Sequence, residues 1–163
     1  MRIIKVGDGD EAVLRQRAER VRRFGPSLHT LLDEMWATLH EAQGVGLAAP
    51  QVGVSQRVAI VKYVAEDSPA RPVRYELINP VIYSTPGKEV GREGCLSLPG
   101  LVAEVPRCKR ISITFQNRYG KSFTLAATGL LARIMQHEVD HLHGRLMTGR
   151  AVRSFAVEEH GKD

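Results

Sequence analysis

Residues 128–142, TGLLARIMQHEVDHL, form the stretch that decides the fold. Apolar residues recur in it at three- and four-residue spacing, which predicts an amphipathic helix that begins near Thr128 and runs through His141. The apolar positions are Leu130, Leu131, Ile134, Met135 and Leu142. Because residues four apart lie on one face of an α-helix, His137 and His141 can reach the same metal ion. We therefore expect a core helix that also carries two candidate metal ligands.

The segments before this helix predict the other elements. Apolar spacing predicts an earlier amphipathic helix over residues 27–42, behind Pro26 and with Ser27 as its capping residue. Short β-like runs stand at 58–64, 75–78, 102–105 and 111–115, and NRYG at 117–120 predicts a hairpin turn into a strand at 122–126. We therefore expect an α+β fold: short, mostly antiparallel strands wrapped around a central metal-binding helix, with an additional N-terminal amphipathic helix.

The composition is that of a soluble globular protein. Hydrophobic residues make up 43% of the 163 positions and charged residues 25%, and no long polar tract interrupts them. A chain of this length can bury roughly two-thirds of the surface that its unfolded form exposes. We expect one catalytic domain over residues 1–163, with a short C-terminal tail from about residue 150 and an exposed loop at 66–72, EDSPARP.

Several classes of protein are disfavoured. No apolar run has the length needed to cross a bilayer, and the N-terminal residues turn charged too early for a signal peptide, so we expect no membrane association and a cytoplasmic location. The net charge is +5, but the basic residues are scattered in short clusters such as Arg20, Arg22 and Arg23. Sequence-specific nucleic-acid binding is not indicated.

A catalytic metal site of this kind normally has three protein ligands and a water, so a third ligand must come from elsewhere. Cys95, in EGCLS, is the candidate, because Gly94 permits an unusual backbone shape and the neighbours are polar. The alternative is that Cys95 is a small core hydrophobe. Cys108 is expected to be structural, and two cysteines in a cytoplasmic chain indicate free thiols or a ligand more than a disulfide.

Two further residues suggest catalytic roles. Glu138 follows the first histidine and can take a proton from a water whose pKa a metal has lowered. Gln51 ends GVGLAAPQ, residues 44–51, where small residues let a substrate approach the backbone and the amide offers two donors. The alternative for this segment is a tight connection between a helix and a strand.

Together, GVGLAAPQ, EGCLS and HEVDHLHG closely resemble, in order and spacing, the three signature motifs of the peptide deformylases. The resemblance extends from residues 6–8 to Leu146 and includes AEVPR at 103–107. It implies an enzyme that hydrolyses the N-formyl group from the formylmethionine of newly synthesised polypeptides. It also implies ferrous iron as the metal in the cell, with zinc, nickel or cobalt as substitutes, although sulfur and nitrogen ligands suit both iron and zinc.

The resemblance assigns roles to individual residues. Cys95, His137 and His141 would hold the metal, and Glu138 would be the general acid/base. Gln51 and the backbone N–H of Leu96 would stabilise the oxyanion of the tetrahedral intermediate.

The resemblance also indicates how the peptide would bind. The backbone of Val45 and Gly46 would pair with the substrate like an added strand. Leu130, Arg133 and Ile134 precede His137 by seven, four and three residues, so their apolar parts can line a pocket for the methionine side chain. Core packing is an equally good explanation for Leu130 and Ile134.

One departure from the family pattern and one rival class of enzyme bear on this interpretation. Many family members continue into a long C-terminal helix to which ribosome binding is often assigned, whereas here only fourteen residues, 150–163, follow Gly149. The ribosome is therefore only weakly indicated as a partner. A zinc endopeptidase would need a downstream third ligand, and none of the available residues stands at the required spacing. These residues are His143, Glu158, Glu159, His160 and Asp163.

Asp140 stands three residues after His137 and borders the metal face without pointing at the ion. A buried carboxylate there would need a cationic partner, because an unpaired buried charge is costly. We expect Arg107, in the family-like VPR stretch, to hold Asp140 and to brace the helix from behind the metal site. The alternative is an exposed aspartate on a solvated face.

Overall fold

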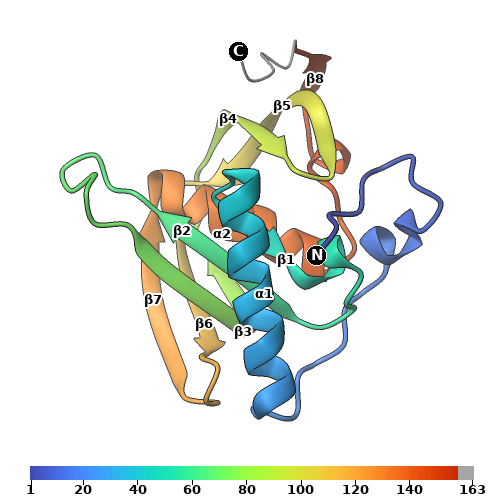
Figure 1. The fold of residues 1–163 in the computed structure, drawn as a ribbon. Helices are drawn as coiled ribbons and strands as arrows, with labels where there is room; N and C mark the ends of the chain where they lie inside the picture. Colours follow the sequence, from blue (N-terminus) through green and yellow to red (C-terminus); the bar gives the residue numbers. More distant parts are fainter. Residues whose placement is uncertain (158–163) are drawn as a thin grey trace.

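The computed structural model describes residues 1–157, and the predicted central helix stands in the middle of the fold as α2 (Gly129–Leu142) (Figure 1). The helix begins one residue after the predicted Thr128, and Gly144 follows its C-terminal residues with a φ of +73°. A Cβ at Gly144 would stand 2.6 Å from the carbonyl oxygen of Arg15. Glycine is therefore required there both by the left-handed backbone and by the neighbouring chain.

Two antiparallel sheets surround this helix. The larger has the order β1-β2-β3-β6-β7, and the smaller has the order β4-β5-β8. The strands of the larger sheet are β1 (Gly46–Ala48), β2 (Val58–Tyr63), β3 (Val73–Ser84), β6 (Arg110–Gln116) and β7 (Ser122–Thr128). Those of the smaller sheet are β4 (Lys88–Cys95), β5 (Leu98–Cys108) and β8 (Arg153–Ala156). The predicted α+β class and mostly antiparallel pairing are confirmed.

Strand β2 shows how the core is divided. Side chains alternate between the two faces of a strand. Val58 and Ile60 pack with the apolar stripe of α1 (Pro26–Ala42), whereas Ala59 and Val61 pack with α2. The larger sheet therefore lies between the two helices, with α1 in front and α2 behind in Figure 1. Each large aliphatic side chain buried in this way contributes about 1.5–3 kcal/mol.

Helix α1 differs from its prediction at one end. Its N-cap is Gly25, which makes no side-chain cap hydrogen bond, and Pro26 opens the helix. The prediction of Ser27 as the cap is therefore wrong. The fixed φ of proline suits the first helical position, which moves the boundary one residue upstream and places Ser27 inside the first turn.

The strands differ more. The runs at 75–78 and 102–105 lie within longer strands, near the start of β3 and in the middle of β5, while β1, β4 and β8 were not predicted. Strand β4, KEVGREGC, combines charged residues with two glycines and is largely exposed, so it lacks the apolar alternation on which prediction depends. Strand β8 takes up part of the expected tail by pairing with β5, and residues 158–163 lie outside the described part of the chain.

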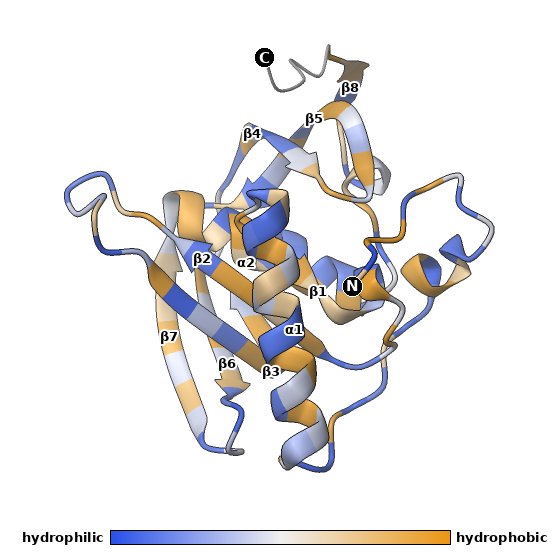
Figure 2. Ribbon diagram, in the orientation of Figure 1, coloured by the Kyte–Doolittle hydropathy of each residue, from blue (hydrophilic) through white to orange (hydrophobic). Residues whose placement is uncertain are grey.

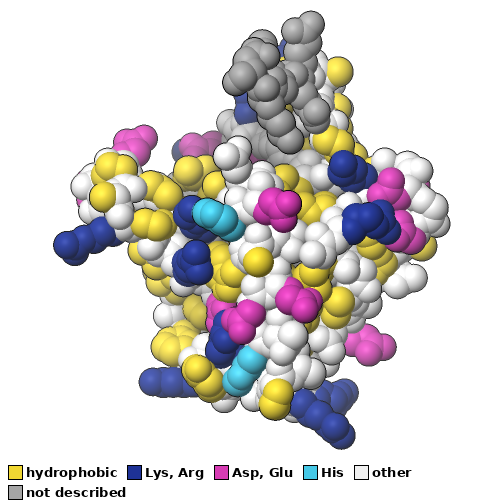
Figure 3. Space-filling model, in the orientation of Figure 1, with side chains coloured by type: hydrophobic (Ala, Val, Ile, Leu, Met, Phe, Trp, Pro, Cys, Tyr) yellow, Lys and Arg dark blue, Asp and Glu magenta, His cyan; other side chains and the backbone are white. Residues whose placement is uncertain are grey.

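The loop predicted at residues 66–72 is confirmed as exposed, and its hydrophilic residues stand out between β2 and β3 in Figure 2. None of the helices in residues 1–157 is both long and apolar enough to span a bilayer. Acidic and basic side chains are interspersed over the face shown in Figure 3.

Candidate active site

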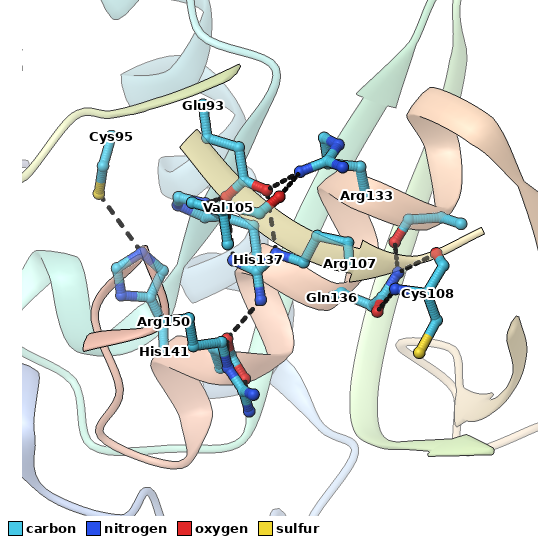
Figure 4. Close-up of polar contacts among 12 residues, drawn as sticks. Glu93, Cys95, Val105, Arg107, Cys108, Arg133, Gln136, His137, His141 and Arg150 are labelled. Carbon is cyan, nitrogen blue, oxygen red and sulfur yellow. Dashed lines mark hydrogen bonds and ion pairs between the residues drawn. The ribbon is translucent and has the colours of Figure 1, made fainter. Parts of the chain in front are cut away.

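The two histidines of α2 and the cysteine at the end of β4 come together. The nearest ligand atoms of Cys95, His137 and His141 all lie within 4.8 Å of one another, and Cys95 Sγ stands 3.5 Å from His141 Nε2 (Figure 4). In a tetrahedral site with zinc-like bonds of about 2.3 Å to sulfur and about 2.1 Å to nitrogen, these two atoms would stand about 3.6 Å apart. The three side chains therefore fit a single divalent ion.

The position of Cys95 depends on an irregularity in the β4–β5 hairpin. The register shifts between Glu93 and Cys95, and Cys95 then pairs with Leu98 across a tight turn. Gly94 has no left-handed φ, so the unusual shape expected at this glycine is a bulge in the pairing and not a special backbone angle. A bulge of this kind re-aims a side chain, here toward α2.

Glu93 was not predicted, although it holds His137 in one orientation. Its Oε1 lies 2.8 Å from Nδ1 of His137, and its two oxygens also accept hydrogen bonds from Arg107 and Arg133 (Figure 4). Burial would raise the pKa of Glu93, but the bonds from His137 and Arg107 outweigh it and lower the pKa to about 2. Glu93 is therefore an acceptor only, which leaves Nε2 of His137 available to a metal.

The two histidines differ in their affinity for protons. Burial lowers the pKa of His137, but its hydrogen bonds with Cys95 and Glu93 outweigh burial and raise the pKa to about 10. Burial and the proximity of His137 hold the pKa of His141 well below its ordinary value. A metal ion must displace a proton from such a site, so metal affinity should increase with pH.

The predicted pairing of Asp140 with Arg107 is confirmed. Arg107 Nη1 donates to Asp140 Oδ2 over 2.6 Å, and both side chains are buried. Arg150, which was not predicted, adds hydrogen bonds of 2.6 and 3.0 Å to the same carboxylate. Because Arg107 also binds Glu93, one guanidinium connects α2 with the strand that ends in Cys95.

Gln51 is held in one orientation. Its Oε1 accepts a hydrogen bond of 3.0 Å from the N–H of Ala48, and its Nε2 donates to Ser97 Oγ over 3.0 Å. The same Nε2 lies 3.7 Å from Cys95 Sγ, and the side chain is fully buried. Gln51 therefore directs an amide N–H toward the ligand cluster, beside the turn that contains Leu96.

Glu138 lies against the backbone of β1. A Cβ at Gly46 would stand 2.8 Å from Glu138 Cδ and would overlap Oε2. Glu138 Oε1 is buried and has no hydrogen-bond partner among the described residues. Burial raises the pKa of Glu138 to about 7 although His137 opposes the shift. A carboxyl group with a pKa near the working pH can both accept and donate a proton.

A cleft of about 500 Å³ joins these groups. All five residues expected to contact the substrate line it, together with Gln51, Cys95, Leu96, His137 and Glu138. The five are Val45, Gly46, Leu130, Arg133 and Ile134. Leu130 is 59% exposed, which excludes the core-packing explanation for it. Ile134 is buried and packs in the core while it also lines the cleft, so its position is compatible with both explanations.

Among residues 1–157, the other residues considered as a third ligand do not join the cluster of Cys95, His137 and His141. His143 is exposed and lines a different cavity, and Cys108 is a partly buried free thiol packed against the core. Glu158, Glu159, His160 and Asp163 lie outside the described residues.

Comparisons with known proteins show the family and the fold of this chain. The family model for polypeptide deformylase matches residues 1–155. Peptide deformylase 1 of Bacillus anthracis is 47% identical over 159 residues, which cover 98% of this chain and 99% of the relative. The crystal structure of peptide deformylase from Thermotoga maritima is similar with a TM-score of 0.83 and 41% identity, over 93% of this chain and 97% of that one.

A further similar structure contains a peptide. It is the class I type b peptide deformylase from Acinetobacter baumannii with Met-Ala-Ser bound, with a TM-score of 0.82 and 34% identity. The similarity covers 92% of this chain and 97% of that chain.

Proposed function

The chain belongs to the polypeptide deformylase family. We propose that it hydrolyses the N-formyl group of formylmethionine at the start of newly synthesised polypeptides, and that Glu138, Gln51 and Leu96 carry the catalytic roles. The observation that carries this proposal is the meeting of a Cys95–His137–His141 cluster, a buried glutamate and an oriented amide in one cleft.

Cys95, His137 and His141 would hold one divalent metal, with ferrous iron as the ion in the cell and zinc, nickel or cobalt as substitutes. The metal would supply Lewis acidity toward the formyl oxygen and lower the pKa of water. The 3.5 Å separation of Cys95 Sγ and His141 Nε2 supports this ligand set, and the mixed sulfur and nitrogen donors suit both iron and zinc.

Glu138 would move the proton. It takes a proton from the attacking water as a C–O bond forms to the formyl carbon, and then donates it to the amine nitrogen as the C–N bond breaks. The products are formate and a peptide with a free amino terminus. The buried position of Glu138 and its pKa of about 7 support both halves of this role.

Gln51 and Leu96 would stabilise the charge that develops on the formyl oxygen. Donors that are already oriented contribute most, because no reorganisation is needed as the charge appears. The hydrogen bonds that Gln51 makes to Ala48 N and Ser97 Oγ support this role for its amide.

The substrate peptide would extend along β1. The backbone of Val45 and Gly46 would add it as a strand, while Leu130, Arg133 and Ile134 would surround the methionine side chain. The guanidinium of Arg133 is bound by Glu93 and by the carbonyls of Val105 and Glu89, which leaves its apolar stem for the pocket. Formyl-methionyl nascent peptides are the proposed partners.

Anaerobically purified protein should contain one divalent metal per chain and should release formate from formyl-Met-Ala-Ser. Acetyl-Met-Ala-Ser serves as the control substrate, because the extra methyl group tests whether the cleft is specific for formyl. A fully metal-loaded protein that releases no formate would contradict the proposal.

A further inference from the structure

A second cavity, of about 640 Å³, lies along a face of α2 that is turned away from the metal ligands. We call it the rear cavity. Gln136, Val139 and Asp140 line it from α2, His143 lines it from just after that helix, and the end of β3 forms another wall. None of the three proposed metal ligands lines it, and it shares no lining residue with the catalytic cleft, so it is a separate cavity.

The rear cavity is strongly cationic. Arg17, Arg57, Lys88 and Arg145 line it, and within residues 1–157 none of the four has a carboxylate partner within salt-bridge distance. Asp140 is the only carboxylate among the described lining residues. Its two oxygens are already bound by Arg107 and Arg150, so it cannot neutralise the other four cations.

Arg57 has a buried donor without a partner and lies near other cations. Its Nη2 donates to the carbonyl oxygen of Pro80 over 3.1 Å, but its Nε is buried and has no hydrogen-bond partner among the described residues. A buried donor without a partner is unfavourable. Burial and the nearby charges of Arg17 and Arg20 also lower the pKa of Arg57, which indicates repulsion between the cations. A bound anion would relieve both effects.

We propose that the rear cavity is a binding site for a small phosphate-bearing anion. A phosphate group carries enough charge and enough acceptor oxygens to serve several cations at once, and guanidinium groups bind it through paired hydrogen bonds. Arg17, Arg57 and Arg145 are the proposed contacts, with Lys88 adding charge. A cavity of about 640 Å³ suits a compact anion better than an extended polymer. The inference does not depend on the deformylase activity.

The test is binding of inorganic phosphate to the metal-loaded protein, measured by calorimetry and by broadening of its phosphorus resonance. The double variant R17Q/R145Q should bind at least roughly tenfold more weakly, because it removes two charged donors. Both residues are exposed, so the fold should be retained, and an unfolding temperature that is not lowered checks this. The matched control R22Q/R71Q removes the same charge from exposed positions elsewhere and should bind as the parent protein does.

Three results with inorganic phosphate would overturn the proposal: no binding to the parent protein, equal weakening in the two double variants, or unchanged affinity in R17Q/R145Q, which would place the phosphate outside the rear cavity. A ten-nucleotide oligouridylate tests the other source of phosphate. If it bound more tightly than inorganic phosphate and also lost affinity in R17Q/R145Q, the site would belong to a nucleic-acid backbone, and the small-anion assignment would be wrong. Weaker binding by the oligonucleotide would support that assignment.

Discussion

Glu93 holds His137 through a 2.8 Å contact between Oε1 and Nδ1, and the same carboxylate binds Arg107 and Arg133. The contact joins the strand that ends in Cys95 to the helix that carries both histidines. It fixes the orientation of one proposed ligand without using a side chain that touches the metal.

Replacing Glu93 by Gln should therefore weaken metal binding roughly 10- to 100-fold, because the amide no longer fixes the tautomer and orientation of His137. Competition with a chelator at constant pH measures the change. Glu104→Gln is the control, since Glu104 is a more exposed carboxylate on the adjacent strand and pairs with Arg153. Equal metal affinity in the parent protein and E93Q would show that Glu93 does not orient the ligand.

Replacing Glu138 by Gln should leave the metal in place but reduce turnover roughly 10²- to 10⁴-fold, since the amide cannot accept the proton of the attacking water. The check is metal content per chain beside formate release. Turnover near that of the parent protein, with full metal content, would remove Glu138 from its role.

The Gln51→Leu variant should lower kcat by roughly 10²- to 10³-fold, as when one oxyanion donor is removed. Leucine also leaves Ser97 Oγ and Ala48 N without their partner, so the unfolding temperature must be measured in parallel. A folded, metal-loaded Q51L protein with unchanged kcat would rule out the proposed role.

Gly46→Ala tests the contact between β1 and the proposed base. The added methyl group would overlap the Glu138 carboxylate, and a displacement of about 1 Å in a catalytic group can cost on the order of a hundredfold in rate. Gly94→Ala is the matched control in the same cleft, since a Cβ there meets no atom within 4 Å. Steady-state kinetics should show a large loss in G46A and little change in G94A, and equal rates would contradict the packing argument.

The parts of the site that the sequence predicts are those with a short-range or motif signal. Helical spacing places His137 and His141 on one face, and the search for a partner for a buried Asp140 leads to Arg107. Glu93 and Arg150 carry no such signal. Glu93 contacts His137 across 44 positions of the chain, and its importance appears only when β4 is placed beside α2.

The elements of the fold also differ in how strong a signal they have in the sequence. Helix α2 and the core of β2 have strong apolar periodicity and were predicted within one residue at each end. Strands β4 and β8 are polar, short or rich in glycine, and they form because β5 offers them an edge. Pairing of this kind depends on tertiary context that a single sequence does not display.

The last prediction concerns pH and a part of the protein remote from the metal. Glu76 accepts hydrogen bonds of 2.9 and 2.8 Å from Arg118 and one of 2.7 Å from Trp36 Nε1. Burial would raise the pKa of Glu76, but these bonds outweigh it and lower the pKa below its ordinary value. A carboxyl group with a lowered folded-state pKa stabilises the fold above its unfolded pKa of about 4.3, and that contribution is lost as the pH falls further.

Glu76→Gln should therefore lower the free energy of unfolding by about 1–2 kcal/mol at neutral pH, a value typical of hydrogen bonds to a charged group at a partly exposed site. The difference from the parent protein should shrink at pH values below about 4, measured by urea unfolding at each pH. Loss of metal in acid affects both proteins alike, so the difference between them reports on Glu76. Glu34→Gln, at an exposed position of α1, should show no such pH-dependent difference. A stability gap for E76Q that stays constant from neutral pH into acid would mean that the charge of Glu76 contributes nothing to the fold.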